Sequence, residues 1–248
     1  MIFLSSLRTF AAQCPLFVDS GKNEKYTQIK FQLKAFSASK TNKNAQNFLK
    51  TLESEKKKLA EFYSLSDRSY NKLAVMSYGI LGVESKFFNS FRYKIKELLP
   101  WAVPFLRPLR RDFFSMNSVN YLVEELKSFP QKKYSTAYNS RGPTQIKFMP
   151  PKLKKIYVHL KKENLSQARH AALATVAYLS ESIPLLRHYE RRSGKKIACS
   201  EYLDHLLFLY SGRAKEILGA RASLENFQYY QKVKSYNKEI RLKLTGYL

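Results

Sequence analysis

The sequence predicts a mainly α protein with a small β part (α+β), and three observations lead to this prediction. Apolar residues recur at helical spacing over much of the chain beyond residue 44. The 248 residues include only 8 Gly and 9 Pro, too few for a turn-dense β-sandwich. With 44% hydrophobic and 14% aromatic residues, the chain can bury a core and is not disordered throughout.

Residues 1–64 are predicted to form an N-terminal extension. Residues 26–36 alternate between apolar and polar side chains, which is the period of a β-strand. After a linker rich in Ser, Asn and Lys, apolar residues at Phe48–Phe62 have the spacing of an amphipathic helix, with Lys56–Lys58 on its polar side. The linker predicts that this extension is separate from the domain of residues 65–248.

The domain predicted for residues 65–248 is helical apart from one insertion. Its first helix begins after Ser66, a good N-cap residue, and runs to Glu84 with apolar or small side chains on nearly every side, as in a core helix. The segment at about 92–138 contains four Pro and a basic run, and we expect it to be an insertion. Further helices are predicted at 166–188, with a break near Pro184, and at 200–210 and 224–236.

The composition also excludes several classes of protein. The 44 Lys and Arg against 19 Asp and Glu leave a net charge of +25, which predicts an acidic partner. Neither common glycine-rich phosphate-binding motif is present, so nucleotide hydrolysis is not expected. No uncharged stretch is longer than the 11 residues of Leu73–Val83, which is short of the roughly 20 that span a bilayer.

Cysteines and histidines give no sign of a metal site. The two cysteines, Cys14 and Cys199, are too few for a zinc cluster, and the sequence leaves open whether they pair. The histidines lack the spacing of metal ligands; they are His159, His170, His188 and His205.

The apolar start Met1–Leu7 hints at an export signal, but Arg8 interrupts it and no basic segment precedes it.

Glu84 is the acidic residue best placed for chemistry. It follows the apolar run Leu73–Val83, at the C-terminal and therefore negative end of the predicted helix. Apolar neighbours and the helix dipole both raise the pKa of a carboxyl group, as a general acid working near neutral pH requires. The alternative is a surface glutamate at a fraying helix end that pairs with Lys86.

A second candidate segment is Gly142-Pro143-Thr144-Gln145. Gly-Pro indicates a turn, and Gln145 then enters a short alternating segment that suits one arm of a β-hairpin. The amide of a glutamine on such an edge can donate hydrogen bonds to an amide-bearing sugar and accept them from it. Taken alone, the segment is an ordinary loop.

Together these segments resemble a known family. Val83-Glu84-Ser85-Lys86-Phe87 is similar to the glutamate–serine motif of lytic transglycosylases in the lysozyme-like superfamily, and Gly142–Gln145 is similar to their glycine-x-x-glutamine motif. Residues 171–179, 209–212 and 225–233 resemble three later motifs of that domain, in the same order. The resemblance implies a lysozyme-like helical domain with a small β-hairpin region. The chain departs from the family in the 61-residue separation of Glu84 from Gln145 and at Leu209, Ser211 and Asn226.

The resemblance implies an enzyme that cleaves peptidoglycan between N-acetylmuramic acid and N-acetylglucosamine, with no cofactor and no metal. Glu84 would protonate the glycosidic oxygen and then act as base on the sugar's 6-hydroxyl, giving a 1,6-anhydro product. One carboxylate suffices because the neighbouring acetamido oxygen replaces the second. A second acid across the groove would instead make the protein a lysozyme; the candidates are Asp112, Glu124, Glu125 and Glu181.

The resemblance also implies residues that support the acid. Two tyrosine hydroxyls would hold Glu84, and Ser85 would anchor the turn that follows it. For both tyrosines the alternative is packing in a helical core. The residues assigned to substrate binding or support are Ser85, Gly142, Thr144, Gln145, Tyr210 and Tyr229.

The positive charge fits more than one class of protein. A cell-wall enzyme would use it to concentrate on anionic peptidoglycan, in the periplasm or otherwise outside the cytoplasm. A helical nucleic-acid binder would use basic runs such as Lys56–Lys58 and Arg107–Arg111 against phosphates. A non-catalytic wall-binding relic of the same fold is a third class. The enzyme is favoured and no nucleic-acid partner is expected, because a nucleic-acid binder has no use for Glu84; the oligomeric state is left open.

Overall fold

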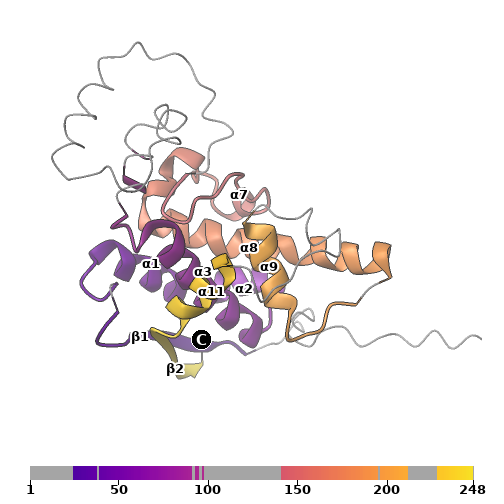
Figure 1. The fold of residues 1–248 in the computed structure, drawn as a ribbon, viewed down its shortest axis with the longest axis horizontal. Helices are drawn as coiled ribbons and strands as arrows, with labels where there is room; N and C mark the ends of the chain where they lie inside the picture. Colours follow the sequence, from indigo (N-terminus) through magenta and orange to yellow (C-terminus); the bar gives the residue numbers. More distant parts are fainter. Residues whose placement is uncertain are drawn as a thin grey trace, which may run out of the picture.

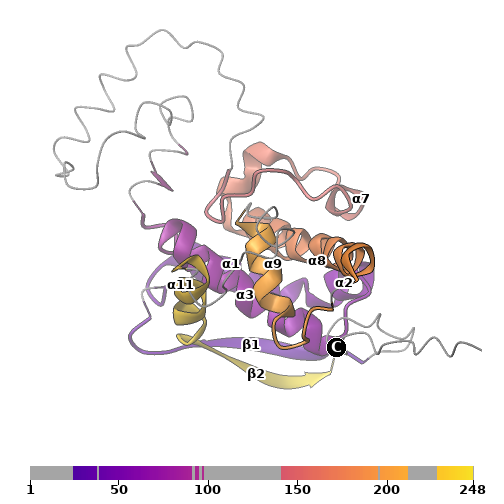
Figure 2. The ribbon, with the colours of Figure 1, turned by 45° about the vertical axis from the view of Figure 1, so that its right-hand side comes forward.

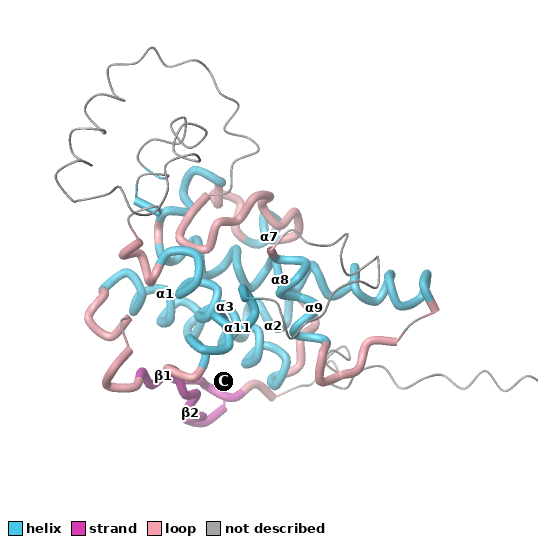
Figure 3. Tube along the Cα trace, in the orientation of Figure 1, coloured by secondary structure: helices cyan, strands magenta, loops and turns pink. Residues whose placement is uncertain are grey.

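The computed structural model describes residues 25–37, 39–90, 93–94, 97, 141–194, 196–211 and 228–247. Within these ranges the protein is mostly helical with one two-stranded antiparallel sheet, which confirms the mainly α prediction. Figure 3 shows the two strands at one edge of the helical body. The elements are β1 (Thr27–Leu33), α1 (Lys43–Ser54), α2 (Lys56–Phe62), α3 (Asp67–Ser85), α7 (Leu153–Ile156), the 3-10 helix η4 (Lys162–Ser166), α8 (Ala168–Ser193), α9 (Tyr202–Tyr210), α11 (Gln228–Asn237) and β2 (Ile240–Tyr247).

The amphipathic segment predicted at Phe48–Phe62 forms two helices, α1 and α2, separated by the single residue Glu55. Asn42 caps α1, since its side chain accepts hydrogen bonds from backbone N–H groups of the first turn. The apolar faces of both helices enter the core, in which Phe48 and Leu59 are fully buried. The period of the apolar residues therefore predicted the buried face correctly but not the break.

Lys56 is buried, so its predicted place on a solvated polar face was wrong. Its ammonium lies 2.6 Å from the carboxylate of Asp67 and donates a hydrogen bond of 2.8 Å to the side chain of Asn71. A buried ammonium is stable only with such partners. Lys56 is therefore part of the packing of α2 on α3 and is not available for the phosphate contact considered above.

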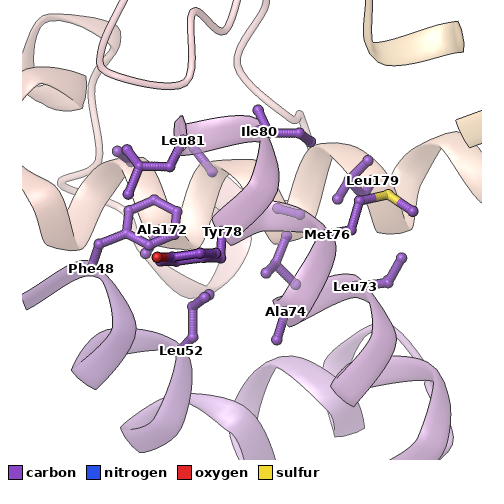
Figure 4. Packing of buried hydrophobic residues seen from close by; sticks show 14 of the residues in the cluster. Phe48, Leu52, Leu73, Ala74, Met76, Tyr78, Ile80, Leu81, Ala172 and Leu179 are labelled. Carbon is purple, nitrogen blue, oxygen red and sulfur yellow. The ribbon is translucent and has the colours of Figure 1, made fainter. Parts of the chain in front are cut away.

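α3 is the central helix and matches the predicted core helix. Ser66 caps it by accepting a hydrogen bond of 3.2 Å from the N–H of Ser69. Its buried side chains pack between those of α1 and α8, as Figure 4 shows for Tyr78 and Leu81 of α3. A helix with partners on several sides buries residues all around, which explains why its apolar residues form no single stripe.

α8 is one continuous helix through Pro184, so the break predicted there was wrong. A proline inside a helix removes one backbone hydrogen bond and bends the helix, but it does not end a helix whose neighbouring turns are anchored. Ile183 and Leu186, on either side of Pro184, are both buried. Figure 1 shows α8 as the long helix that passes behind α3 and α9.

The sheet joins the two ends of the described chain. β1 pairs with β2 in antiparallel register, with Leu33 opposite Ile240 and Thr27 opposite Tyr247 (Figure 2). The sequence predicted β1 but not β2. Residues 25–64 also share one hydrophobic core with the later helices, since α1 packs on α8. The predicted boundary at residue 64 therefore does not separate two cores within the described part of the chain.

Among the helices of the described ranges, none combines the length and the apolar character needed to cross a bilayer.

Candidate active site

Glu84 lies in the last turn of α3 and is half-buried. The buried Ser85 next to it donates a hydrogen bond of 2.9 Å to the carbonyl of Leu81 and accepts one of 3.0 Å from the N–H of Phe88. These two bonds tie the end of the helix to the turn that follows. Ser85 thus fixes the backbone on which the Glu84 side chain stands.

The turn after α3 has an unusual backbone. Lys86, Phe87 and Phe88 all have positive φ values, of 47°, 56° and 68°. Such left-handed residues cost energy and persist only where packing holds them. Phe87 is fully buried, with its ring centroid 4.8 Å from that of Tyr78 and 5.2 Å from that of Tyr236. Burial of this ring therefore holds the turn beside Glu84.

Tyr229 approaches Glu84 from the first turn of α11. The ring is half-buried, but its hydroxyl is fully buried. Burial raises the pKa of this phenol well above its ordinary value of 10.0, and Glu84 raises it further, through its charge and as a hydrogen-bond partner. At neutral pH Tyr229 is therefore a neutral phenol whose pKa responds to the charge of Glu84.

Close packing of α11 on α3 brings Tyr229 to this position. A Cβ added at Gly79 would collide with Asn237 and lie 2.7 Å from the Val233 carbonyl oxygen, and one at Gly82 would lie 2.6 Å from the Tyr236 ring. The α3 backbone thus meets the α11 backbone at Gly79 and the Tyr236 ring at Gly82, and such a close approach requires residues without a side chain. Figure 1 shows α11 beside α3.

Tyr210 reaches the site from the last residue of α9. Its ring packs edge-on against Tyr178 of α8, with centroids 5.2 Å apart, and its hydroxyl donates a hydrogen bond to the carbonyl of Thr144. Burial raises the pKa of Tyr210 well above 10.0, and the charge of Glu84 is the next cause. Tyr210 therefore lies between the acid and the turn that carries Gln145.

The segment around Gly142 is a tight bridged turn. Arg141 and Ile146 exchange two backbone hydrogen bonds of 2.9 Å, which is the extent of the predicted hairpin within the described residues. Gly142 has φ of 76°, and a Cβ there would overlap the carbonyl oxygen of Leu165. Its N–H donates a hydrogen bond of 2.8 Å to the carboxylate of Glu97. A glycine is required at this position by both its φ angle and its close neighbour.

Thr144 and Gln145 have different roles within this turn. Thr144 is fully buried, and its hydroxyl accepts a hydrogen bond of 2.9 Å from Thr175 of α8. Gln145 is half-buried with φ of 57°, and its amide nitrogen donates a bond of 2.7 Å to the Gly142 carbonyl. In this conformation the Gln145 amide nitrogen stabilises its own turn through the bond to Gly142.

Thr175 is a supporting residue that sequence reasoning missed. It is fully buried in α8, and its hydroxyl oxygen lies 2.9 Å from the Thr144 hydroxyl and 2.7 Å from the Ala171 carbonyl oxygen, within hydrogen-bond distance of both. Its signal in the sequence is the one threonine within the mostly apolar run 171–179. The structure thus joins the turn to α8 as well as to α9.

Of the four candidate second acids, Glu181 lies within the described residues, and its contacts are with other elements. Glu181 of α8 accepts hydrogen bonds from the Tyr63 hydroxyl at 2.8 Å and from the Lys152 backbone at 3.1 Å, so it links α8 to the end of α2 and the start of α7. Asp112, Glu124 and Glu125, with most of the predicted insertion, lie outside the described residues.

Two hollows on the described surface lie away from Glu84. One of about 640 Å³ lies between α1 and the start of α8, and one of about 440 Å³ lies between α3, α9 and β2. The candidate site is therefore recognised from its polar contacts rather than from a cavity. Within the described ranges, no group of three or more His, Cys, Asp or Glu side chains could hold a metal ion.

Cys199 is disulfide-bonded. Cys14, the other cysteine of the sequence, lies outside the described residues.

No family model, no curated protein and no solved structure matches this chain. The interpretation of the site therefore depends on the geometry and chemistry of its own residues.

Proposed function

We propose that the protein cleaves the glycosidic bond between N-acetylmuramic acid and N-acetylglucosamine in peptidoglycan, with Glu84 as the general acid and then the base. One observation carries the proposal. Glu84 lies at the end of a buried helix, and its charge raises the pKa of two half-buried tyrosines, Tyr210 and Tyr229, that come from different helices. In the sequence these residues lie more than 100 positions from Glu84, so the fold gathers them at the acid.

The surroundings of Glu84 suit proton donation to a glycosidic oxygen. The C-terminal end of a helix and nearby apolar side chains both favour the neutral form of a carboxyl group. A neutral phenol such as Tyr229 can hydrogen-bond the carboxyl in either protonation state, which keeps its orientation as the proton leaves and returns. The lysozyme-like fold implied by the sequence motifs is part of this proposal.

A single carboxylate favours the transglycosylase outcome over hydrolysis. Among the described residues, Glu84 is the only carboxylate whose charge acts on both Tyr210 and Tyr229. In a mechanism with one carboxylate, the substrate's acetamido oxygen assists departure of the leaving group. Glu84 then takes the proton of the 6-hydroxyl as this oxygen closes the 1,6-anhydro ring. The net charge of +25 and the disulfide at Cys199 support a site of action outside the cytoplasm, on an anionic wall.

Mass spectrometry of the fragments released from purified peptidoglycan tests the proposal. The wild-type protein should release muropeptides with 1,6-anhydro ends, and Glu84→Gln should lower the rate by at least about 100-fold, since it removes the transferable proton. Glu61→Gln, at an exposed residue of α2, is the matched control and should retain the wild-type rate.

Each other outcome points elsewhere. Reducing ends would identify a lysozyme, and cleavage by Glu84→Gln at the wild-type rate would reject Glu84 as the acid. Wall binding without release of fragments would identify a wall-binding relic. Absence of both wall binding and release, together with salt-sensitive binding of an oligonucleotide, would favour the nucleic-acid binder.

A further inference from the structure

Three basic side chains gather at the turn that carries Gln145. Arg141 and Lys147 lie at the open end of the bridged turn, because Arg141 pairs with Ile146 and Lys147 comes next in the chain. Lys162 begins η4, and η4 packs on the same turn, since the Leu165 carbonyl lies against Gly142. We call Arg141, Lys147 and Lys162 the cationic rim.

The rim residues are close enough to influence one another. Burial lowers the pKa of Lys162, the positive charges of Arg141 and Lys147 lower it further, and Glu163 acts in the opposite direction. Glu97 offsets part of the charge, since its carboxylate lies 3.3 Å from the Arg141 guanidinium. Like charges held together in this way cost energy that an anionic ligand would relieve.

An exposed aromatic ring lies beside the rim. Phe148 is 55% exposed, and the ammonium of Lys147 lies 5.3 Å from the centroid of its ring. A pyranose presents an apolar face that can pack on such a ring, while its carboxylate substituents pair with ammonium and guanidinium groups. Ring and cations together suit an anionic saccharide.

We propose that the cationic rim binds carboxylates of the glycan strand whose bond Glu84 cleaves. The inference rests on the proposed function and adds the substrate chemistry that holds the strand in place. Tyr210 connects the turn that carries Arg141 and Lys147 to Glu84, since it is bonded to Thr144 and its pKa is raised by the charge of Glu84. In this proposal a strand bound at Glu84 extends past the rim. Two kinds of carboxylate occur on such a strand: the carboxylates of the attached peptides and, on N-acetylmuramic acid residues that carry no peptide, the free lactyl carboxylate.

Binding to purified peptidoglycan, measured by co-sedimentation over a salt series, tests the rim. All proteins carry Glu84→Gln so that the wall stays intact. The double variant Lys147→Gln/Lys162→Gln should bind about tenfold more weakly, because charge-assisted contacts are lost, with a shallower salt dependence. The matched control is Lys30→Gln/Lys34→Gln on and beside β1, where Lys34 lies 5.7 Å from the 72% exposed ring of Phe36. It removes the same charge beside a similar ring and should bind within about twofold of the unmodified rim.

Treated walls identify the carboxylate. Removal of the peptides with an amidase hydrolyses the amide bond to each lactyl group and leaves a lactyl carboxylate in its place. Binding that still depends on the rim then shows that a lactyl carboxylate is sufficient, and binding that no longer depends on it assigns the rim to the peptide carboxylates. On walls whose carboxylates have all been amidated, the rim variant and its parent should bind equally.

Several results would overturn the inference. One is that the rim and control variants weaken wall binding equally. A second is that the rim variant still binds more weakly than its parent on fully amidated walls. A third is that the rim variant weakens binding to a single-stranded oligonucleotide as much as binding to the wall, which would indicate phosphate binding. Because binding is read without cleavage, failure of the rim leaves the role of Glu84 intact. Conversely, wild-type protein that releases no fragments would reject the proposed cleavage while the measured wall binding stands.

Discussion

The hydroxyl of Tyr210 donates a hydrogen bond to the backbone carbonyl of Thr144, 66 residues earlier in the chain. The same phenol has its pKa raised by burial and by the charge of Glu84. One side chain at the end of α9 therefore interacts with the acid and also holds the turn that carries Gln145. This relationship makes Tyr210 the most informative supporting residue to change.

Tyr210→Phe should lower the rate of muropeptide release about tenfold and the free energy of unfolding by only about 1 kcal/mol, because a carbonyl loses its donor while the ring stays. Initial rates of release and chemical denaturation measure the two effects. Tyr189→Phe, at a half-buried tyrosine of α8, is the control and should leave the rate unchanged. Loss of stability with a wild-type rate would assign Tyr210 to packing alone.

Glu84→Gln should lower the pKa of Tyr229 while leaving the phenol buried. Burial is the largest cause of the raised pKa, and the charge and hydrogen bonding of Glu84 are the further causes that the variant weakens. The raised pKa means that the folded protein favours the neutral phenol. The contribution of Tyr229 to stability is thus fully present below the pKa of an unfolded tyrosine, about 10, and is lost as pH rises above it.

Carbon NMR of ring-labelled tyrosine measures this titration, with Tyr229→Phe to assign the signal. An identical titration of Tyr229 with and without the Glu84 charge would show that the two groups do not interact, whatever the enzymatic result.

The ion pair between the buried Lys56 and the half-buried Asp67 should set part of the acid stability. Burial alone would raise the pKa of Asp67, but hydrogen bonds from Lys56 and Thr27 and the charge of Lys56 lower it below the ordinary 3.8. Because the folded-state pKa is depressed, the pair contributes stability above pH 3.8, and this contribution is lost as pH falls through the folded-state value. Asp67→Asn should therefore flatten the decline of unfolding free energy below about pH 4.

Lys56→Met tests the other partner of this pair at neutral pH. It should cost about 3 kcal/mol of unfolding free energy because it leaves the Asp67 carboxylate without its cation. Lys57→Met, at the adjacent exposed residue, should cost less than about 0.5 kcal/mol. Equal effects of the two substitutions in urea denaturation would contradict the assignment of Lys56 to the core.

Gly79→Ala should destabilise the protein although alanine is the better helix former. Helix propensity alone predicts a gain of about 1 kcal/mol, whereas the added methyl group collides with α11 and should cost about 1 to 3 kcal/mol. Thermal unfolding gives the sign of the net effect. The NMR signal of Tyr229 should also move, because α11 carries this ring; a more stable variant with an unmoved signal would show that α11 packs less closely than described.

Individual residues show which features of the fold the local sequence pattern predicts. Ser66 and the apolar run that ends at Val83 predicted α3 to within a residue at each end, because capping and burial act within a few turns. The break at Pro184 and the solvated position of Lys56 were wrong for a common reason. Both residues depend on neighbours from other elements, which the local pattern does not contain.

The sequence by itself determined that the protein is mainly helical, that α3 is buried, and that an acidic side chain stands at its end. These properties follow from the period of apolar side chains and from capping, which are local. Only the tertiary structure decided that Glu84 acts on Tyr210 and Tyr229, that Tyr210 is bonded to the Thr144 turn, and that β1 pairs with a strand at the other end of the described chain. Contacts between residues so far apart in the sequence depend on how the helices pack and on whether each buried polar group has a partner from another element. Both require the whole core to form together.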